Sequence, residues 1–289
     1  MHGIVFGKGF LGTRIANVLG YITTGVDTTD ALSLGSYLDR EKPDVVINAV
    51  AKTGIGNIDW CESHKEETIL SNLVGAVNLC VECAKRNIYF VHMGSGCVYD
   101  GDNGGKGFSE DDEPNFYGPQ FYAKTKILAE KALKEFPCLI VRLRMPIDEI
   151  PHEKNFIDKV SKYKQVIDIP NSMTTITHMI GSLRQAISQR KLGVFNFVNP
   201  GTISAAEIMS MYKEIINPDH TFKVISGDDL DKMTVAKRSN CVLNTDKMKE
   251  NGLLMPDIHD AVRESLKLYS WYVSQPMLKE VCCEDKRSV

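Results

Sequence analysis

The spacing of Tyr122 and Lys126 is the first feature of this sequence that could do chemistry. Tyr122-Ala123-Lys124-Thr125-Lys126 lies in a helical pattern, and a separation of four residues puts both side chains on one helix face. An ammonium beside a phenol can lower the pKa of the phenol, so Tyr122 could protonate a carbonyl oxygen as a general acid. The same spacing is common on ordinary surface helices, and this pair alone therefore names no reaction.

Ser95 lies upstream, in the loop Met93-Gly94-Ser95-Gly96-Cys97 that follows an apolar, strand-like run. Ligands of open parallel α/β sheets bind beyond the carboxyl ends of the strands, where such a loop belongs. Ser95, Tyr122 and Lys126 are therefore the predicted catalytic set at a carbonyl, and we expect Lys126 also to reach the ribose of a cofactor.

A glycine pattern predicts the site of that cofactor. Residues 7–12 have the sequence Gly7-Lys8-Gly9-Phe10-Leu11-Gly12 and follow the first strand-like run of the chain. In a G-x-G-x-x-G loop the first glycine permits a tight turn, the second lets the backbone approach a pyrophosphate, and the third lets the helix pack on the strand. The pattern predicts a dinucleotide site, although a ligand-free turn of the same composition is possible.

Two charged residues argue in opposite directions about the dinucleotide. Asp27 follows the second predicted strand, where a carboxylate binds the adenosine ribose and repels a 2′-phosphate, which favours NAD(H). Lys8 lies within the phosphate loop and could neutralise a 2′-phosphate, which favours NADP(H). Asp27 could equally be a plain turn residue.

The elements that must position these groups alternate along the first half of the chain. Strands are expected over residues 3–6, 21–26, 44–50, 88–93 and 138–143, and helices over 10–19, within 32–42, and over about 63–86 and 120–135. The strands are almost continuously apolar, as in a parallel sheet covered on both faces. We predict an α/β fold with a Rossmann-type doubly wound parallel sheet in residues 1–146. Residues 147–289 should form mainly a smaller C-terminal substrate-binding lobe, with some segments, such as 194–198, returning to the sheet.

Composition excludes several classes of partner. The chain has 289 residues, 43% hydrophobic and 25% charged, with a formal net charge of −3, so it lacks the basic field that nucleic-acid binding needs. We find neither a leader-like start nor a membrane-length apolar run, and expect a cytoplasmic protein. The eight cysteines show no paired metal-ligand spacing, so no metal site is expected, and Cys80 and Cys83 should be buried helix residues.

Longer segments add a family resemblance. Together with the glycine loop, Ser95, Tyr122 and Lys126, they make the chain similar to the extended short-chain dehydrogenases/reductases. Within these, it most resembles the plant-type 3,5-epimerase/4-reductases of UDP-4-keto-6-deoxyglucose. The segments are IDWCESHKEET (58–68), GFSEDDEPNFYG (107–118), RLRMPI (142–147), KNFIDKV (154–160), VIDIPNSMT (166–174), NFVNPG (196–201) and AKRSN (236–240).

The resemblance implies a bifunctional enzyme that makes UDP-L-rhamnose with NADPH. By motif, Cys97 and Lys159 become the acid/base pair of epimerisation, because a C4 ketone acidifies the protons on C3 and C5. The implied cofactor contacts are residues 7–12, Asp27, Ala49, Val50, Ala51, Thr53, Asn72, Tyr122, Lys126 and Met145. The implied substrate contacts are Ser95, Gly96, Cys97, Tyr122, Asn155, Phe156, Asn171, Ser172, Met173, Arg238 and Asn240, with Arg238 on the diphosphate.

The chain departs from the family in its first loop, which is one residue shorter than the usual G-x-x-G-x-x-G. A separate 4,6-dehydratase is expected to supply the 4-keto sugar, and a homodimer is possible. Two alternatives stay open: a reductase without epimerase activity, acting on a dTDP- or UDP-linked sugar, and a non-catalytic NADP-binding regulatory subunit.

Overall fold

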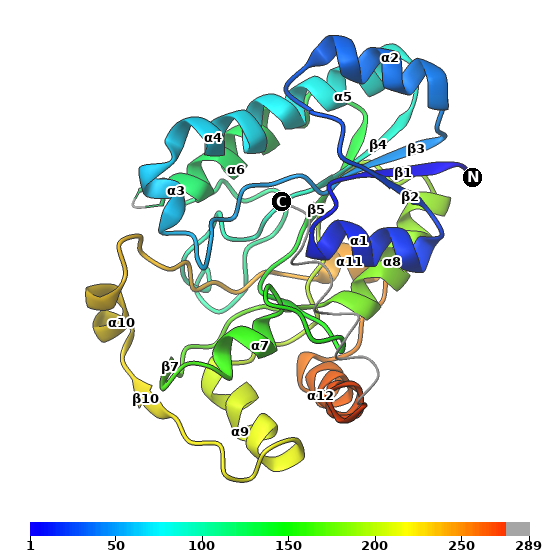
Figure 1. Cartoon of the computed structure of the whole chain (residues 1–289). Coiled ribbons are helices and arrows are strands. Elements are labelled where there is room, and N and C mark those ends of the chain that lie inside the picture. The colour runs from blue at the N-terminus through cyan, green and yellow to red at the C-terminus, as the bar shows by residue number, and fades with distance from the viewer. Residues whose placement is uncertain (119, 276–289) are drawn as a thin grey trace.

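A computed structural model describes residues 1–118 and 120–275, and a six-stranded parallel sheet forms its centre (Figure 1). The strands are β1 (Gly3–Phe6), β2 (Ile22–Thr24), β3 (Val45–Asn48), β4 (Tyr89–Met93), β5 (Cys138–Arg142) and β9 (Gly193–Asn196), in the order β2-β1-β3-β4-β5-β9. After β2 the chain crosses to the other side of β1. The strand order therefore reverses between β1 and β3, which is where α/β sheets of this kind bind their ligands.

Helices cover both faces of the sheet and bury its apolar residues. On one face α1 (Phe10–Leu19), α8 (Ile176–Ser188) and α11 (Asp246–Glu250) close one core cluster, and on the other α2 (Ala31–Glu41), α5 (Gly75–Lys85) and α6 (Phe121–Leu133) close a second (Figure 1). The predicted α/β doubly wound parallel sheet is thus confirmed. Cys80 and Cys83 lie in the second core, as expected for buried helix residues.

The predicted helix over about 63–86 is wrong in detail. The chain there forms α3 (Trp60–Ser63), α4 (Lys65–Ile69), a π-helix (Leu70–Val74) and then α5. In a π-helix the hydrogen bonds span five residues instead of four, so one turn is wider and the side chains after it are rotated relative to those before it. The expected strands at 21–26 and 44–50 are also shorter than predicted.

The later part of the chain builds most of a second lobe below the sheet in Figure 1. Its elements are β6 (Pro146–Ile147), α7 (Phe156–Val160), β7 (Gln165–Ile167), β8 (Thr174–Thr175), α9 (Ala205–Ile215), β10 (Lys223–Ile225), α10 (Gly227–Met233) and α12 (Ile258–Ser274). A separate apolar cluster holds this lobe together. Three elements of the same stretch, α8, β9 and α11, return to the sheet, and residues 276–289 of the predicted lobe lie outside the described residues.

The two parts of the chain are joined by an ion pair between the half-buried Arg14 and the buried Asp148. Arg14 of α1 donates to the Asp148 carboxylate at 2.6 and 3.0 Å and to Glu149 at 2.8 Å. Burial raises the pKa of Asp148 to about 6, although the Arg14 guanidinium opposes the rise. None of the helices in the described part of the chain is long and apolar enough to cross a membrane.

Candidate functional site

The glycine loop between β1 and α1 has the geometry of a phosphate-binding turn. Gly7 has φ +105°, a conformation that residues with a side chain rarely adopt, and a Cβ added there would lie 3.0 Å from the Ala49 carbonyl. A Cβ on Gly12 would collide with the Gly7 carbonyl. Around Gly9, by contrast, no described atom lies within 4 Å of an added Cβ. The open space at Gly9, next to the first turn of α1, fits a pyrophosphate.

Lys8 and Asp27 lie at the adenosine end of this loop. The Lys8 side chain lies over Gly25, because a Cβ added to Gly25 would be 3.6 Å from the Lys8 Cε and 3.9 Å from its Nζ. The Asp27 carboxylate accepts hydrogen bonds from the Thr29 amide and hydroxyl, both at 2.8 Å. Asp27 thus stabilises a turn with Thr29, which is the structural alternative to binding a ribose. The Lys8 side chain is exposed.

Asn72, a predicted cofactor contact, holds the loop that follows β3. Its Oδ1 accepts from the Lys52 amide at 2.7 Å, and its Nδ2 donates to the Lys52 carbonyl at 3.0 Å and to Thr125 at 3.2 Å. The π-helix turns this side chain toward the loop. The amide therefore positions residues 49–53, of which Ala51 and Thr53 are exposed and Ala49 and Val50 half-buried.

Ser95 and Tyr122 lie together at the carboxyl end of β4. The Ser95 hydroxyl accepts from the Cys97 amide at 3.1 Å and hydrogen-bonds the Tyr122 phenol. Burial raises the pKa of Tyr122 above its usual value, the nearby Cys97 thiol adds to the rise, and the hydrogen bond with Ser95 opposes it. Tyr122 is thus a protonated phenol at neutral pH, which is the form a general acid needs.

The described hydrogen bonds of Lys126 are made with residues of β4 and not with Tyr122. Its Nζ donates to the Met93 carbonyl at 3.0 Å and lies 3.2 Å from the Nε2 of His92. The expectation that its ammonium lowers the pKa of Tyr122 is not met, because the shift of Tyr122 is upward and comes first from burial. Burial also lowers the pKa of Lys126 to about 8, against the charge of Glu130.

Cys97 belongs to the loop after β4, which a buried arginine also contacts. Arg144 is 1% exposed and donates to the Gly96 carbonyl at 3.2 Å and to Asn171 Oδ1 at 2.7 Å. Burial lowers the pKa of Arg144, but the nearby groups that can carry negative charge, Cys241, Cys97 and Asp100, together raise that pKa overall. The Arg144 guanidinium favours the charged form of the Cys241 thiol, but burial raises the pKa of Cys241 more, to about 11.

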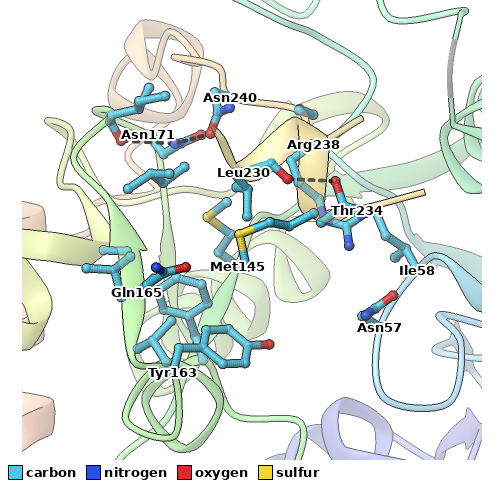
Figure 2. A pocket seen from close by; sticks show the side chains of 18 of the residues that line it. Asn57, Ile58, Met145, Tyr163, Gln165, Asn171, Leu230, Thr234, Arg238 and Asn240 are labelled. Atoms are coloured by element: carbon cyan, nitrogen blue, oxygen red, sulfur yellow. Dashed lines mark hydrogen bonds between the residues drawn. The ribbon is translucent and has the colours of Figure 1, made fainter. Parts of the chain in front are cut away.

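A cavity of about 840 Å³ opens beside Cys97, and Figure 2 shows its walls. Side chains of the second lobe form most of it, with Asn57 and Ile58 on the opposite wall. Six predicted substrate contacts line it: Cys97, Phe156, Asn171, Met173, Arg238 and Asn240. Met145, predicted to contact the cofactor, lines it as well. None of the lining residues from the described ranges is acidic, which suits an anionic ligand.

Arg238, the predicted diphosphate contact, already has a carboxylate partner. Its guanidinium donates to Asp59 at 2.7 and 3.1 Å, and the Ala236 amide donates to the same carboxylate at 2.9 Å. The hydrogen bonds from Arg238 hold the pKa of Asp59 below its usual value, against the effect of burial. Arg238 therefore lies in the cavity wall as half of an ion pair that joins the two parts of the chain.

Five predicted substrate contacts, Ser95, Gly96, Tyr122, Asn155 and Ser172, are not among the lining residues of the cavity, and neither is the predicted acid Lys159. Asn155 and Ser172 are fully buried: Asn155 accepts from the Ile157 amide at the start of α7, and Ser172 accepts from the Leu243 amide. Lys159 is half-buried on α7 and is not among the lining residues, although its neighbours Phe156 and Val160 are. Burial lowers the pKa of Lys159, and the charge of Lys154 lowers it further.

Sequence reasoning missed several residues of the cavity wall. Lys162 and Lys164 supply exposed positive charge there, and Gln120 lies at its buried end. Gln120 donates from Nε2 to the Lys237 carbonyl at 3.0 Å, but its buried Oε1 has no partner in the described structure. An unpaired acceptor two residues before Tyr122 marks a place for a ligand donor. Its position just before the Tyr122 helix was the only signal in the sequence.

Comparisons with known proteins agree with this geometry. Residues 9–270 match the family described as RmlD substrate binding domain. Over 280 residues the chain is 35% identical to the bifunctional dTDP-4-dehydrorhamnose 3,5-epimerase/dTDP-4-dehydrorhamnose reductase of Arabidopsis thaliana, covering 91% of this chain and 90% of that protein.

Two further similar proteins have names that refer to UDP-linked sugars. A trifunctional UDP-glucose 4,6-dehydratase/UDP-4-keto-6-deoxy-D-glucose 3,5-epimerase/UDP-4-keto-L-rhamnose-reductase of Arabidopsis thaliana is 36% identical over 249 residues, or 84% of this chain, which spans only 36% of that protein. The crystal structure of the L780 UDP-rhamnose synthase of Acanthamoeba polyphaga mimivirus superposes with a TM-score of 0.88 at 31% identity, covering 93% of this chain and 99% of that one.

Proposed function

The chain belongs to the RmlD substrate-binding-domain family of extended short-chain dehydrogenases/reductases, and from this premise we propose that it reduces and epimerises a nucleotide-linked 4-keto-6-deoxy sugar. The proposed reaction converts UDP-4-keto-6-deoxy-D-glucose into UDP-L-rhamnose with NADPH, and a 4,6-dehydratase must form that substrate. The observation that carries the proposal is the meeting of Ser95, Tyr122 and Cys97 beside a large cavity without acidic lining residues.

The glycine loop fits a dinucleotide, and its surroundings favour NADP(H). The open space at Gly9 accommodates the pyrophosphate, and the exposed Lys8 over Gly25 can neutralise a 2′-phosphate. Asp27 offers less opposition to that phosphate than expected, because two hydrogen bonds from Thr29 already occupy one of its oxygens. When bound, NADPH supplies the hydride for the C4 carbon of the sugar.

The residues of this chain supply the proton and hold the sugar. Tyr122, kept protonated by burial, donates its phenolic proton to the C4 oxygen, and Ser95 orients the phenol through their hydrogen bond. The unpaired Gln120 Oε1 can accept a hydrogen bond from a sugar hydroxyl. Lys162 and Lys164 offer cations for the diphosphate in addition to the paired Arg238.

Epimerisation needs a base and an acid on opposite faces of the sugar. Cys97 lies in the cavity wall, and its amide donates to Ser95, the partner of Tyr122, so its thiol lies next to the predicted reducing centre, which supports Cys97 as the base. Lys159 has a pKa lowered by burial, which suits a proton donor, and it would have to move into the cavity from α7 to act. This position of Lys159 is the one observation that favours the alternative of a reductase without epimerase activity.

One experiment separates these functions. The protein is given UDP-4-keto-6-deoxyglucose and NADPH in deuterated water, and both cofactor oxidation and deuterium at C3 and C5 are followed. We expect oxidation together with deuterium at both carbons. Oxidation without deuterium would leave a reductase alone, and the absence of oxidation with either NADPH or NADH would favour the non-catalytic regulatory subunit.

Two variants divide the labour between the residues. Tyr122→Phe should keep the exchange at C3 and C5 but lose reduction by about 100- to 10,000-fold, the usual contribution of a general acid. Cys97→Ala should lose the exchange and still reduce a sugar that is supplied already epimerised. Equal loss of both activities in Tyr122→Phe would contradict this division.

A further inference from the structure

Hydrogen bonds link three buried side chains, Asn48, His92 and Lys126, and the first two have no role in the function proposed above. Asn48 of β3 and His92 of β4 are neighbours in the parallel register of the sheet, and they are 0% and 1% exposed. The Asn48 amide lies 3.1 Å from His92 Nδ1, and His92 Nε2 lies 3.2 Å from Lys126 Nζ. The donor and the acceptor in each of these hydrogen bonds can be determined by starting from a group that can only donate.

That group is the backbone amide of Val50, which contacts the Asn48 side chain. The Val50 N–H can only donate, and it lies 3.0 Å from Asn48, so the atom facing it must be the carbonyl oxygen Oδ1. The Asn48 NH₂ group then faces His92 and donates to Nδ1. Turning the Asn48 amide over would place two donors face to face at Val50, which is costly for buried groups.

This direction determines the tautomer of His92. Because Nδ1 accepts a hydrogen bond, it carries no proton, and the single proton of the neutral ring is on Nε2. Protonation of both ring nitrogens is opposed first by burial and then by the charge of Lys126, and the Asn48 NH₂ group leaves Nδ1 no acceptor for a proton of its own. Accordingly, the pKa of His92 lies well below its usual value. The Nε2–H therefore points at Lys126.

We propose that His92 is a positioning residue for Lys126: held by Asn48 in the tautomer with its proton on Nε2, it donates a hydrogen bond to Nζ and so favours the neutral amine. An ammonium has no lone pair to accept that bond, whereas the amine accepts from His92 and still donates to the Met93 carbonyl. The burial that lowers the pKa of Lys126 to about 8 acts in the same direction.

The inference rests on the proposed function, because it concerns how the reducing centre recovers its proton. After Tyr122 gives its proton to the C4 oxygen, a phenolate remains. Lys126 has no described hydrogen bond to Tyr122, so we infer that a water or hydroxyl group bridges them. An N–H bond of the Lys126 ammonium breaks, the bridging group passes a proton on, the O–H bond of Tyr122 forms, and the neutral amine that His92 stabilises remains. Lys126 thereby acts as a proton store that works near neutral pH instead of as a permanent charge.

Other ionisable groups near Lys126 do not reverse this conclusion. Glu130, one turn further along α6, is bound to Arg142 of β5 through both oxygens, and its charge raises the pKa of Lys126 less than burial lowers it. The residues 70–74 of the packed π-helix carry no ionisable side chain. The remaining ionisable groups on α6 and on the described elements packed against it are Tyr122, Lys124 and Lys131 of α6, Cys61 and Glu62 of α3, Lys65, Glu66 and Glu67 of α4, Cys80, Glu82, Cys83 and Lys85 of α5, and Cys138 of β5.

The first test is made on the unaltered protein without substrate. Long-range proton–nitrogen NMR correlations show which ring nitrogen of a histidine carries its proton, and the His92 signals are assigned by their absence in His92→Gln. We expect the proton on Nε2 and an unprotonated Nδ1 from about pH 6 to 9, although a free histidine titrates near 6.5. A proton on Nδ1, or titration near 6.5, would overturn the proposal.

The second test reverses the hydrogen-bond direction. In Asn48→Asp the carboxylate accepts from both Val50 and His92 Nδ1, so Nε2 becomes an acceptor for the ammonium. The Lys126 pKa, followed through the Cε methylene resonance, should then rise by about one unit or more, a tenfold change in acid dissociation. Asn199→Asp, another buried asparagine, should leave it unchanged. An unshifted Lys126 titration in Asn48→Asp overturns the proposal, and if that variant does not fold, the tautomer of the unaltered protein decides.

These readouts do not depend on turnover. If the protein fails to oxidise NADPH with the 4-keto sugar, the proposed function fails while the tautomer and the Lys126 titration remain measurable. If turnover is observed but the proton is on Nδ1, only the role of His92 fails.

Discussion

Two buried basic side chains on neighbouring elements, Arg142 and Lys126, differ in whether a carboxylate pairs with them. Arg142 of β5 is 0% exposed and Lys126 of α6 is 3% exposed. Arg142 donates to both oxygens of Glu130, at 2.9 and 2.6 Å, whereas both hydrogen-bond partners of Lys126 in the described chain, His92 and Met93, are uncharged. Glu130 lies one helical turn from Lys126 and yet is directed to Arg142.

The two cations consequently shift in opposite directions. Burial alone would lower the pKa of each, but the hydrogen bonds and charge of Glu130 raise the pKa of Arg142 above its usual value. The charge of Glu130 raises the pKa of Lys126 less than burial lowers it, and this pKa falls to about 8. A paired cation cannot exchange a proton near neutral pH and serves structure, whereas the unpaired amine can serve proton transfer.

The largest expected effect is the loss of stability when the Arg142–Glu130 ion pair is broken. Glu130→Gln leaves the Arg142 guanidinium buried without a carboxylate, and we expect the free energy of unfolding to fall by about 3–5 kcal/mol. Denaturant unfolding measures this loss. Lys134→Gln is the matched control, because Lys134 approaches the same carboxylate at 3.4 Å from a more exposed position and should cost less than about 1 kcal/mol.

The double variant Glu130→Leu with Arg142→Met tests the cause of that loss. Removing both charges leaves no unpaired buried ion, so the double variant should be more stable than Glu130→Gln. A double variant that is as unstable as the single one would mean that packing, and not the unpaired charge, dominates.

How far the sequence predicts these regions depends on how local their contacts are. The first strand, the glycine loop and α1 were predicted to the residue, because the pattern that determines them lies within about 20 residues. The π-helix was not, since helical periodicity over a few residues does not distinguish hydrogen bonds spanning four residues from those spanning five. The fold class followed from the alternation of apolar runs and helical patterns alone.

The contacts that sequence reasoning missed join distant segments. His92 is a single histidine in an apolar strand, and its partners come from β3 and from α6, 44 and 34 residues away. Arg238 meets Asp59 across 179 residues. Residue types and local spacing carry no information about such pairings, so a paired arginine and a free one look alike in the sequence.

The lowered pKa of Lys126 predicts a pH dependence of the unfolding free energy, an effect of intermediate size. Between about pH 8 and the usual lysine value of 10.5, the unfolded chain keeps a proton on Lys126 that the folded chain has lost. Unfolding then takes up a proton, so stability should rise with pH by up to about 1.4 kcal/mol per pH unit. Lys126→Met should lack this rise. The difference in unfolding free energy between the two proteins, measured across the window, cancels the other titrating groups, and parallel curves would contradict the assignment.

The smallest expected effect is that of salt on the Arg142–Glu130 ion pair. An exposed ion pair weakens as salt screens it, but the Arg142–Glu130 pair is enclosed and its two atoms are in direct contact. The stability difference between the unaltered protein and Glu130→Gln should therefore change by less than about 0.5 kcal/mol between low and high salt. Denaturation in urea, which adds no ions, measures it. A difference that shrinks markedly with salt would show that water and ions reach the pair, and the contrast between a sealed Arg142 and a proton-exchanging Lys126 would then have to be abandoned.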